Sequence, residues 1–232
     1  MIKEVIILAG GLGTRLRDAV PDLPKCMAPI NGRPFIGYVI QHLKQQGVER
    51  FIFSLGYKHD YFTEFLQGEL LPHQYVLCIE EEPLGTGGAI QYASAFAQNE
   101  NVLVTNGDTL FNVDVAALSQ QHFSHSSHCT LSLKPMQQFE RYGVVEVDEE
   151  QRIMSFKEKK HYAEGLINGG VYALNIPGLR SKSLPEKFSF EKDYLEAFYH
   201  EHHFYAAIQQ AYFIDIGIPE DYEKAARDLR AE

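Results

Sequence analysis

The chain has 232 residues, of which 45% are hydrophobic and 22% charged, and its formal net charge is −10. This composition is typical of a globular protein with a sizeable core, and it excludes collagen, low-complexity disorder and coiled coil. Proteins that bind polyanions usually carry an excess of Lys and Arg, so we expect no nucleic acid partner.

Three features of the sequence favour a cytoplasmic protein. No apolar run reaches the roughly 18 residues that cross a membrane. Residues 1–8 include Glu4 and lead directly into a glycine-rich turn, unlike a signal peptide. The cysteines, Cys26, Cys78 and Cys129, are too few and too far apart for a disulfide framework or a zinc site. We therefore expect a cytoplasmic location and no membrane partner.

The first half of the chain alternates between strand and helix patterns. Residues 5–8 are wholly apolar, as in a strand that is buried on both faces. Residues 35–46 carry apolar side chains at helical spacing, and Gly47 follows as a C-cap. The other expected elements are strands at 51–55, 75–79 and 102–105, and helices at 60–66 and 87–96. Strands that alternate with helices predict a parallel sheet with right-handed crossovers.

The second half of the chain is richer in strand patterns. A helix is expected at 190–199 and another from Pro219, because a proline suits the first helical position. The expected strands lie at 129–133, 143–147, 152–157, 171–174, 205–208 and 212–214. Together the patterns predict one α/β domain over residues 1–232, with a Rossmann-like mixed, mainly parallel sheet flanked by helices and with halves at 1–125 and 126–232.

A glycine-rich loop, residues 8–16 (LAGGLGTRL), follows the first expected strand. Adjacent glycines let backbone N–H groups approach phosphates without a Cβ clash. Arg15 adds a bidentate fork, and Lys25, which follows Pro24, adds a point charge. The loop is not a Walker loop, because no Gly-Lys-Ser/Thr follows, and it lacks the third glycine of the Rossmann fingerprint. The loop therefore predicts a phosphate site of another kind.

This loop and the Pro-Lys pair resemble those of the sugar-1-phosphate nucleotidylyltransferases, and the resemblance continues through almost the whole chain. These enzymes join a nucleoside triphosphate to a sugar 1-phosphate, on a fold of the nucleotide-diphospho-sugar transferase type. The resemblance implies that Arg15 holds the triphosphate and Lys25 the reacting phosphates. The nucleotide-binding residues that it implies are Leu8, Ala9, Gly10, Gly11, Gly13, Thr14, Arg15, Lys25, Glu80, Gly85, Thr86, Asn106 and Gly107.

Residues 80–88 (EEEPLGTGG) close the third expected strand and open a helix, and in the family this stretch contacts the base. Glu80 stands five positions before Gly85, where many relatives place a base-binding Gln or Glu. A carboxylate can accept from both N–H donors on the Watson–Crick edge of guanine, whereas uracil and thymine suit an amide better. GTP is therefore the favoured triphosphate.

Two aspartates are the candidate metal ligands. Asp108 follows the expected strand at 102–105, and α/β proteins bind their ligands at the carboxyl ends of parallel strands. Asp215 lies in the stretch 213–222, which resembles a late motif of the family. The resemblance implies that the two carboxylates hold Mg²⁺, a hard cation that prefers oxygen ligands.

Three stretches resemble the part of the family site that binds the sugar phosphate, in the half at 126–232. The resemblance implies that the backbone at Tyr142-Gly143 meets the sugar, that Glu158 and Asn168 bind its hydroxyls and that Lys159 holds its phosphate. The implied sugar-phosphate residues are Tyr142, Gly143, Glu158, Lys159, Asn168 and Gly169, and the implied catalytic residues are Arg15, Lys25, Asp108 and Lys159.

Within the family, the stretches 27–30, 83–88, 165–170 and 186–191 resemble the guanylyltransferases that act on D-glycero-α-D-manno-heptose 1-phosphate. This implies GDP-heptose as the product, for bacterial surface glycans. The short chain disfavours the bifunctional relatives that carry an acyltransferase extension. Two alternative activities stay open, those of a mannose-1-phosphate guanylyltransferase and of an N-acetylmuramate-1-phosphate uridylyltransferase. The oligomeric state also stays open, and a homo-oligomer is possible.

Two other classes of protein fit the sequence less well. A non-catalytic nucleotide-sugar sensor would be expected to lack Arg15, Lys25 or Asp108, and all three are present. A metal-dependent glycosyltransferase would want Asp-x-Asp at a strand end, where this chain has Asn106-Gly107-Asp108.

The histidines do not have the His-Glu-x-x-His spacing of a zinc site. The most concentrated are the trio His122, His125 and His128 and the run at 200–203. We expect all of these to be solvated surface residues.

Overall fold

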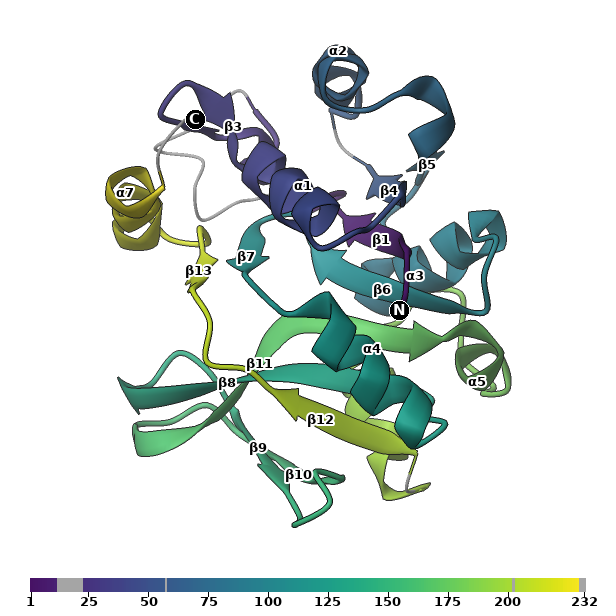
Figure 1. Ribbon diagram of the computed structural model, residues 1–232, viewed down its shortest axis with the longest axis vertical. Coiled ribbons are helices and arrows are strands. Elements are labelled where there is room, and N and C mark those ends of the chain that lie inside the picture. The colour runs from purple at the N-terminus through teal and green to yellow at the C-terminus, as the bar shows by residue number, and fades with distance from the viewer. Residues whose placement is uncertain (12–22, 57, 202, 230–232) are drawn as a thin grey trace.

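The computed structural model describes residues 1–11, 23–56, 58–201 and 203–229, and within these ranges one mixed sheet runs through both halves of the chain (Figure 1). Its strand order is β10-β9-β11-β6-β1-β4-β5, and β8 pairs with β11 and with β12. The strands are β1 (Glu4–Leu8), β4 (Arg50–Leu55), β5 (Tyr75–Ile79), β6 (Asn101–Asn106), β8 (Cys129–Phe139), β9 (Val144–Val147), β10 (Ile153–Lys157), β11 (Tyr162–Asn175) and β12 (Phe204–Ile208).

The first half has the predicted alternation. Its strands β1, β4, β5 and β6 are all parallel to their neighbours of this half. The α-helices within the described ranges are α1 (Phe35–Gln45), α2 (Asp60–Glu69), α3 (Gly85–Ala93), α4 (Val115–Ser124), α5 (Ile176–Arg180), α6 (Glu196–Phe198) and α7 (Pro219–Asp228). The prediction of a mainly parallel sheet between helices is therefore confirmed for this half.

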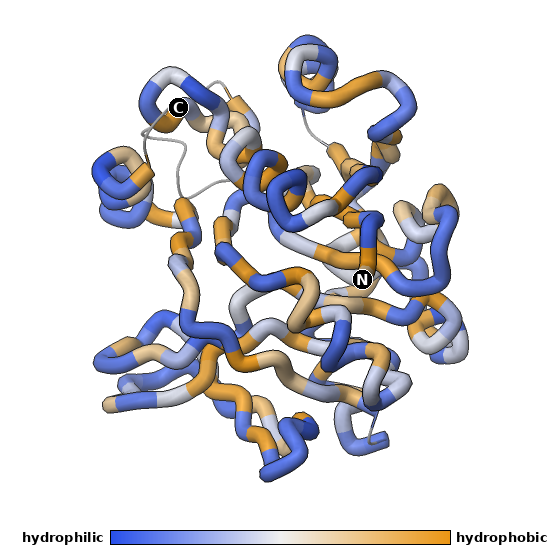
Figure 2. The backbone as a smooth tube through the Cα atoms, viewed as in Figure 1, coloured by the Kyte–Doolittle hydropathy of each residue, from blue (hydrophilic) through white to orange (hydrophobic). Residues whose placement is uncertain are grey.

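Strand β1 is buried on both faces, as its apolar sequence predicts. Val5 and Ile7 pack into the core that α1 and α4 cover, and Ile6 packs into the core on the opposite face, with α3. In Figure 1, α1 and α4 lie in front of the sheet and α3 behind it. Figure 2 shows hydrophobic residues gathered along the central strands and hydrophilic residues in the outer loops.

The second half of the chain is largely antiparallel, and two of its strands are longer than expected. β8 has 11 residues and β11 has 14, and they pair along most of their length. The pairing register shifts between Asn168 and Tyr172, where Gly170 has a φ of +72°. This irregularity lets the strand continue through Asn168-Gly169-Gly170, a stretch that the sequence pattern alone would break.

Two local signals in the first half were missed. Asn31-Gly32, with positive φ at both residues, turns the short hairpin of β2 (Pro29–Ile30) and β3 (Arg33–Pro34), and Asn-Gly is the favoured dipeptide of such a turn. Asp114 caps α4 by accepting a hydrogen bond from the Ala117 N–H at 2.9 Å.

The helix predicted at 190–199 forms only in part. Residues Phe190–Leu195 make a π-helical turn, which α6 and a 3₁₀ turn at Tyr199–Glu201 follow. The wider turn begins where Ser189 caps it and where Phe190 packs against Tyr172. The packing of this segment against the sheet therefore overrides the regular helical period.

The expectation that the histidines are solvated is wrong for His122. Its side chain is buried between α4 and the sheet, within hydrogen-bond distance of Thr130 Oγ1 (3.1 Å) and Asn101 Oδ1 (3.0 Å). Burial, and secondarily the neighbouring His128, lower the pKa of His122 to about 4. His122 is thus a neutral core residue at pH 7.

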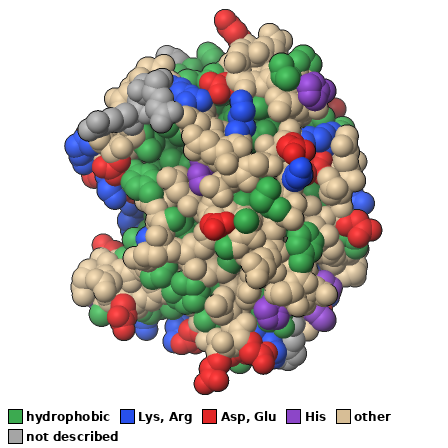
Figure 3. Space-filling model, viewed as in Figure 1, with side chains coloured by type: hydrophobic (Ala, Val, Ile, Leu, Met, Phe, Trp, Pro, Cys, Tyr) green, Lys and Arg blue, Asp and Glu red, His purple; other side chains and the backbone are tan. Residues whose placement is uncertain are grey.

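In the described ranges no helix is long and apolar enough to cross a bilayer. On the face drawn in Figure 3, acidic and basic side chains are interspersed.

Candidate active site

A cavity of about 920 Å³ lies at the carboxyl ends of the parallel strands β1, β4, β5 and β6. This is the edge at which open α/β sheets bind their ligands. The predicted site residues that line it are Leu8, Ala9, Gly10, Gly11, Lys25, Glu80, Gly85, Thr86, Asn106, Asp108 and Asp215.

The register of the strands explains why these residues converge. Leu8 pairs with Ser54 on one side and with Asn106 on the other, so three parallel strands end level. The residues that follow are tied together, since the Ala9 N–H donates to the Ser54 carbonyl at 2.9 Å and the Gly107 N–H donates to the Leu8 carbonyl at 2.8 Å. Gly107 is therefore buried under the cavity floor rather than in its lining.

Gly10 lies where the glycine loop passes close to β4 and β5. A Cβ at this position would be 3.1 Å from the Gly56 nitrogen and 3.1 Å from Glu80 Oε1. The absent side chain thus lets the backbone of the loop run against the ends of both strands. Gly13, Thr14 and Arg15, which the sequence assigns to the same loop, lie outside the described residues.

Hydrogen bonds to both carboxylate oxygens orient the Glu80 side chain. Oε1 accepts from the Ser54 hydroxyl at 2.9 Å, and Oε2 accepts from the Leu84 N–H at 3.1 Å. An ionised carboxylate has about four acceptor sites, so each oxygen keeps capacity for a ligand. Glu80 can accept from a base edge, and its position is fixed before any base arrives.

The loop that opens α3 is locked to a segment of the second half, residues 186–191. The Gly87 N–H donates to the Phe188 carbonyl at 2.9 Å, and a Cβ on Gly87 would lie 2.0 Å from the Phe188 ring. The Thr86 hydroxyl donates to Glu191 Oε2 at 2.8 Å and accepts from the Phe190 N–H at 2.8 Å. Thr86 is therefore committed to the protein through its side chain.

Phe188 and Glu191 do not line the cavity, but they hold the loop that does, and sequence reasoning did not assign them this role. The signal was present, because the run of glycines after Pro83 leaves room for a neighbour that lies far away in the chain. Which segment fills that room is decided by the tertiary structure.

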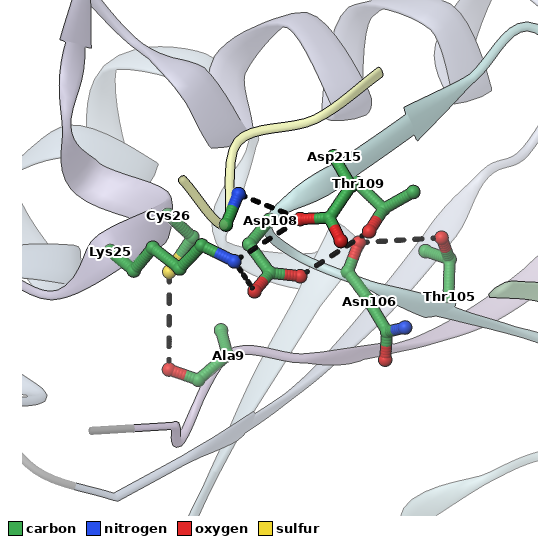
Figure 4. Close-up of polar contacts among 9 residues, drawn as sticks. Ala9, Lys25, Cys26, Thr105, Asn106, Asp108, Thr109 and Asp215 are labelled. Atoms are coloured by element: carbon green, nitrogen blue, oxygen red, sulfur yellow. Dashed lines mark hydrogen bonds and ion pairs between the residues drawn. The ribbon is translucent and has the colours of Figure 1, made fainter. Parts of the chain in front are cut away.

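Asp108 and Asp215 are brought together by a two-stranded sheet that the sequence pattern missed in part. β7 (Thr109–Phe111) pairs antiparallel with β13 (Phe213–Asp215), with Asp215 opposite Thr109. The Ile216 N–H also donates to the Asp108 carbonyl at 3.1 Å. The two carboxylates thus face one volume at the end of the cavity (Figure 4).

Lys25 lies between these two carboxylates. Its Nζ is 2.5 Å from Asp108 Oδ2 and 3.2 Å from Asp215 Oδ1. Lys25 begins a 3₁₀ turn after Pro24, with Cys26 and Met27 buried behind it. Burial raises the pKa of the Cys26 thiol, so that this neighbour stays protonated and uncharged.

The same carboxylate pair fits a divalent cation. The pair already shares one positive group, and in the described part of the chain no third acidic, His or Cys side chain joins it to complete a metal cluster. Mg²⁺ is typically held by one or two carboxylates with substrate phosphates rather than by a full protein cage. The donor set therefore suits a cation that arrives with a phosphate ligand.

The predicted sugar-phosphate residues do not line the cavity, but two of them adjoin the carboxylate pair. Tyr142 packs edge-on against Phe213, and burial together with the Asp215 charge raises the pKa of Tyr142 to about 12. A Cβ on Gly169 would meet the Phe111 ring at 2.4 Å. Tyr142 and Gly169 therefore flank the small sheet that carries Asp215.

Asn168 and Gly143 have structural partners of their own. Asn168 Nδ2 donates to the Tyr172 hydroxyl at 2.8 Å, and Oδ1 accepts from the Gly170 N–H at 3.0 Å. Gly143 immediately precedes β9, and a Cβ on it would lie 2.3 Å from the carbonyl oxygen of Lys157 at the end of β10, so the two backbones approach closely here. Asn168 thus holds the strand irregularity in place.

Glu158 and Lys159 follow β10 and are exposed. The Tyr162 hydroxyl donates to the Glu158 carbonyl at 2.9 Å, which holds the backbone of this turn. Their side chains lie apart from the described lining of the cavity.

Comparison with known proteins covers nearly the whole chain. Residues 4–232 match the family model described as Nucleotidyl transferase. The D-glycero-alpha-D-manno-heptose 1-phosphate guanylyltransferase of Aneurinibacillus thermoaerophilus is 48% identical over 227 residues, 98% of this chain and 98% of that protein. The enzyme of the same name from Campylobacter jejuni is 46% identical over 219 residues, 94% of this chain and 96% of that protein.

Solved structures agree with these matches. The crystal structure of HddC from Yersinia pseudotuberculosis has a TM-score of 0.89 at 39% sequence identity, over 99% of this chain and 100% of that one. HddC complexed with GMP-PN has a TM-score of 0.87 at 38% identity, with the same coverage. The resemblance inferred from the motifs is confirmed, and the chain belongs to the nucleotidyl transferase family.

Proposed function

We propose that this protein transfers a guanylyl group from GTP to D-glycero-α-D-manno-heptose 1-phosphate and releases GDP-heptose and pyrophosphate. The observation that carries the proposal is a single cavity lined by the cluster of Lys25, Asp108 and Asp215 and also by Glu80. The two relatives that are nearly half identical to this chain bear the name of this activity.

In this reaction a phosphate oxygen of the sugar 1-phosphate attacks the α-phosphorus of GTP, and pyrophosphate leaves. A phosphate monoester has a second pKa near 6, so most of this nucleophile is already dianionic at pH 7 and needs no general base. The work of the protein is then to bring the two phosphates into line and to offset their charges.

The donor phosphates would be held by backbone N–H groups of Gly10 and Gly11, by Lys25 at the α-phosphate and by Arg15 at the β- and γ-phosphates. Mg²⁺ held by Asp108 and Asp215 would supply further charge neutralisation when bound. Asn106 and the ends of β1 and α3 would complete the nucleotide site in residues 1–125.

The acceptor would be held from residues 126–232. Lys159 would bind the attacking phosphate, and Glu158, Asn168 and the backbone at Tyr142-Gly143 and Gly169 would bind the sugar. Tyr142 lies close to Asp215, and this supports the arrangement because the proposed acceptor residues then adjoin the carboxylate pair.

Glu80 would select the base by accepting from guanine N1–H and the 2-amino group. A site built for two donors rejects analogues that lack them, because its own buried polar group is then left unpaired. Inosine triphosphate keeps only N1–H and is expected to fall between GTP and ATP.

The test is a pyrophosphate-release screen of GTP, inosine triphosphate, ATP, UTP and dTTP against heptose, mannose and N-acetylmuramate 1-phosphates. We expect GTP with the heptose to be fastest. Preference for UTP or dTTP would refute the base assignment, and preference for mannose 1-phosphate would refute the sugar.

The Glu80→Gln variant separates the base contact from the rest of the site. It is expected to erode the ranking of triphosphates more than it lowers turnover with the best one, whereas the exposed Glu82→Gln should leave the ranking unchanged. An unchanged ranking in Glu80→Gln would move base selection to Glu82 or to the backbone at Gly85 and Thr86.

A further inference from the structure

The Lys25 ammonium lies between the two carboxylates that the proposed function assigns to a divalent cation. It contacts Asp108 Oδ2 at 2.5 Å and Asp215 Oδ1 at 3.2 Å, and these three side chains are only 14%, 33% and 29% exposed. Two carboxylates that are partly withdrawn from water and face each other repel unless a cation lies between them. Lys25 supplies that cation within the chain itself.

The surroundings hold the ammonium in this place. Asp215 Oδ1 also accepts from the Gly217 N–H at 2.8 Å, and a Cβ on Gly217 would lie 3.1 Å from the Lys25 Nζ. The backbone at Gly217 therefore closes one side of the pair, and the cavity is open to Lys25 on another. A side chain with four methylene groups can swing toward the cavity while its backbone stays fixed in the turn.

A divalent cation and the ammonium cannot share this position. Both would lie between the same two carboxylates, and two cations a few ångströms apart repel each other strongly at a partly buried site. The cation can bind well only when Lys25 has another anionic partner. The α-phosphate of the nucleotide, at which the proposed function puts Lys25, is that partner.

We propose that Lys25 is an internal competitor of the divalent cation, which holds Asp108 and Asp215 together in the free protein and leaves them when nucleotide phosphates bind. The idea rests on the proposed metal role of this carboxylate pair. By linkage, whatever draws Lys25 away strengthens cation binding, and the cation in turn strengthens phosphate binding by the same factor. The free protein would then bind the cation weakly, and the nucleotide would couple the two events.

The test measures cation binding without nucleotide. Mn²⁺ is titrated into the full chain, and free Mn²⁺ is followed by electron paramagnetic resonance, for the unchanged protein and for Lys25→Met. We expect Lys25→Met to bind Mn²⁺ at least about fivefold more tightly, within the usual range of coupling between sites. Lys25→Gln removes the charge but keeps a hydrogen-bond donor, and we expect it to bind Mn²⁺ more tightly by the same factor. It takes the place of Lys25→Met in the test if Lys25→Met folds poorly.

Arg141→Met is the matched control. Arg141 is close enough to Asp215 for that charge to raise its pKa, but it pairs with Asp221 rather than with Asp108 or Asp215. If Arg141→Met tightens Mn²⁺ binding as much as Lys25→Met, the effect is one of general charge and the proposal is wrong. Unchanged or weaker Mn²⁺ binding in both Lys25 variants would also refute it.

Adding Asp108→Asn to Lys25→Met distinguishes this inference from the proposed metal site. Loss of the gain in the double variant supports competition at this pair. If the single Asp108→Asn weakens Mn²⁺ binding while Lys25→Met does not strengthen it, the competition is refuted and the metal assignment survives. If Asp108→Asn has no effect in either background, both are refuted.

Discussion

The parallel strands of the first half and the antiparallel strands of the second half reach the cavity in different ways. β1, β4 and β6 end level, so that the loops after them lie side by side at one edge of the sheet. β11 instead passes the site and continues, and its irregularity at Asn168–Gly170 lies within the strand.

Under the proposed function this difference separates the two substrates. A nucleotide would meet mostly backbone groups and glycines that the end of a parallel sheet presents, whereas a sugar phosphate would meet side chains spaced along an antiparallel frame. Asp108 follows the parallel strand β6 of the first half, and Asp215 belongs to β13 of the second half. The carboxylate pair therefore lies where the two halves of the chain meet.

The largest expected effect is on turnover, and it should be the same for a substitution in either half of the chain. Asp108→Asn and Asp215→Asn each remove a proposed cation ligand with little change in volume. Each is expected to lower kcat by about 10²-fold or more, the order found when a preorganised electrostatic group is lost. Steady-state pyrophosphate release measures this.

Asp114→Asn is the control for the same chemical change. Asp114 caps α4 away from the cavity, and Asn caps a helix about as well. Near-normal turnover of Asp108→Asn or Asp215→Asn with Mg²⁺, at the level of this control, would contradict the metal assignment.

The next effect sharpens the comparison by separating donor from acceptor. Lys159→Ala is expected to raise KM for the sugar phosphate and Arg15→Ala KM for the triphosphate, since loss of a desolvated charged hydrogen bond costs about 2–5 kcal/mol. Lys160→Ala is the control, because Lys160 is the exposed neighbour of Lys159 and contacts the Tyr162 ring. If Lys159→Ala changed only the triphosphate KM, the division between halves would be wrong.

A smaller effect, on stability, concerns the contact between the start of α3 and residues 186–191. Gly87→Ala would drive a methyl group into the Phe188 ring, and such overpacking costs about 1–3 kcal/mol of the free energy of unfolding. Gly68→Ala in α2 has open space around it and is expected to stabilise the protein by up to about 1 kcal/mol. Chemical denaturation measures the free energy of unfolding of both variants. Equal values would mean that the Phe188 ring moves aside at no cost.

The last effect is of similar size and lies away from the cavity, in the packing of α4 on the sheet. The pKa of His122 is about 4 in the folded protein against 6.5 for the ordinary side chain. Between these values the unfolded chain binds more protons, so stability falls as pH falls from 6.5 toward 4 and changes no further below it. The loss between pH 7 and pH 5 is expected to be about 2 kcal/mol.

Denaturation of the unchanged protein and of His122→Gln over this pH range tests the assignment. The variant starts less stable, because it loses buried contacts, and its pH slope is expected to be shallower. Equal slopes would mean that other groups carry the pH dependence.

The sequence by itself determined the parallel half, the order of the motifs and more than half of the residues in the cavity lining, although not Gly56, Ala89, Thr109 or Gly217. A buried strand, a glycine loop and a strand-end Asp are local patterns, and their physical causes lie within a few residues. Lys25 and Asp108 could therefore be named without a structure, and Glu80 was named from the resemblance to the family.

Only the tertiary structure decided the contacts between distant segments. The pairing of β7 with β13, the fit of Phe188 against Gly87 and the burial of His122 depend on which elements pack together, and no local period encodes that. The position of Lys25 between Asp108 and Asp215 belongs to the same class, because the three residues meet only when the strands that carry the carboxylates have paired and the turn at Lys25 has packed beside them.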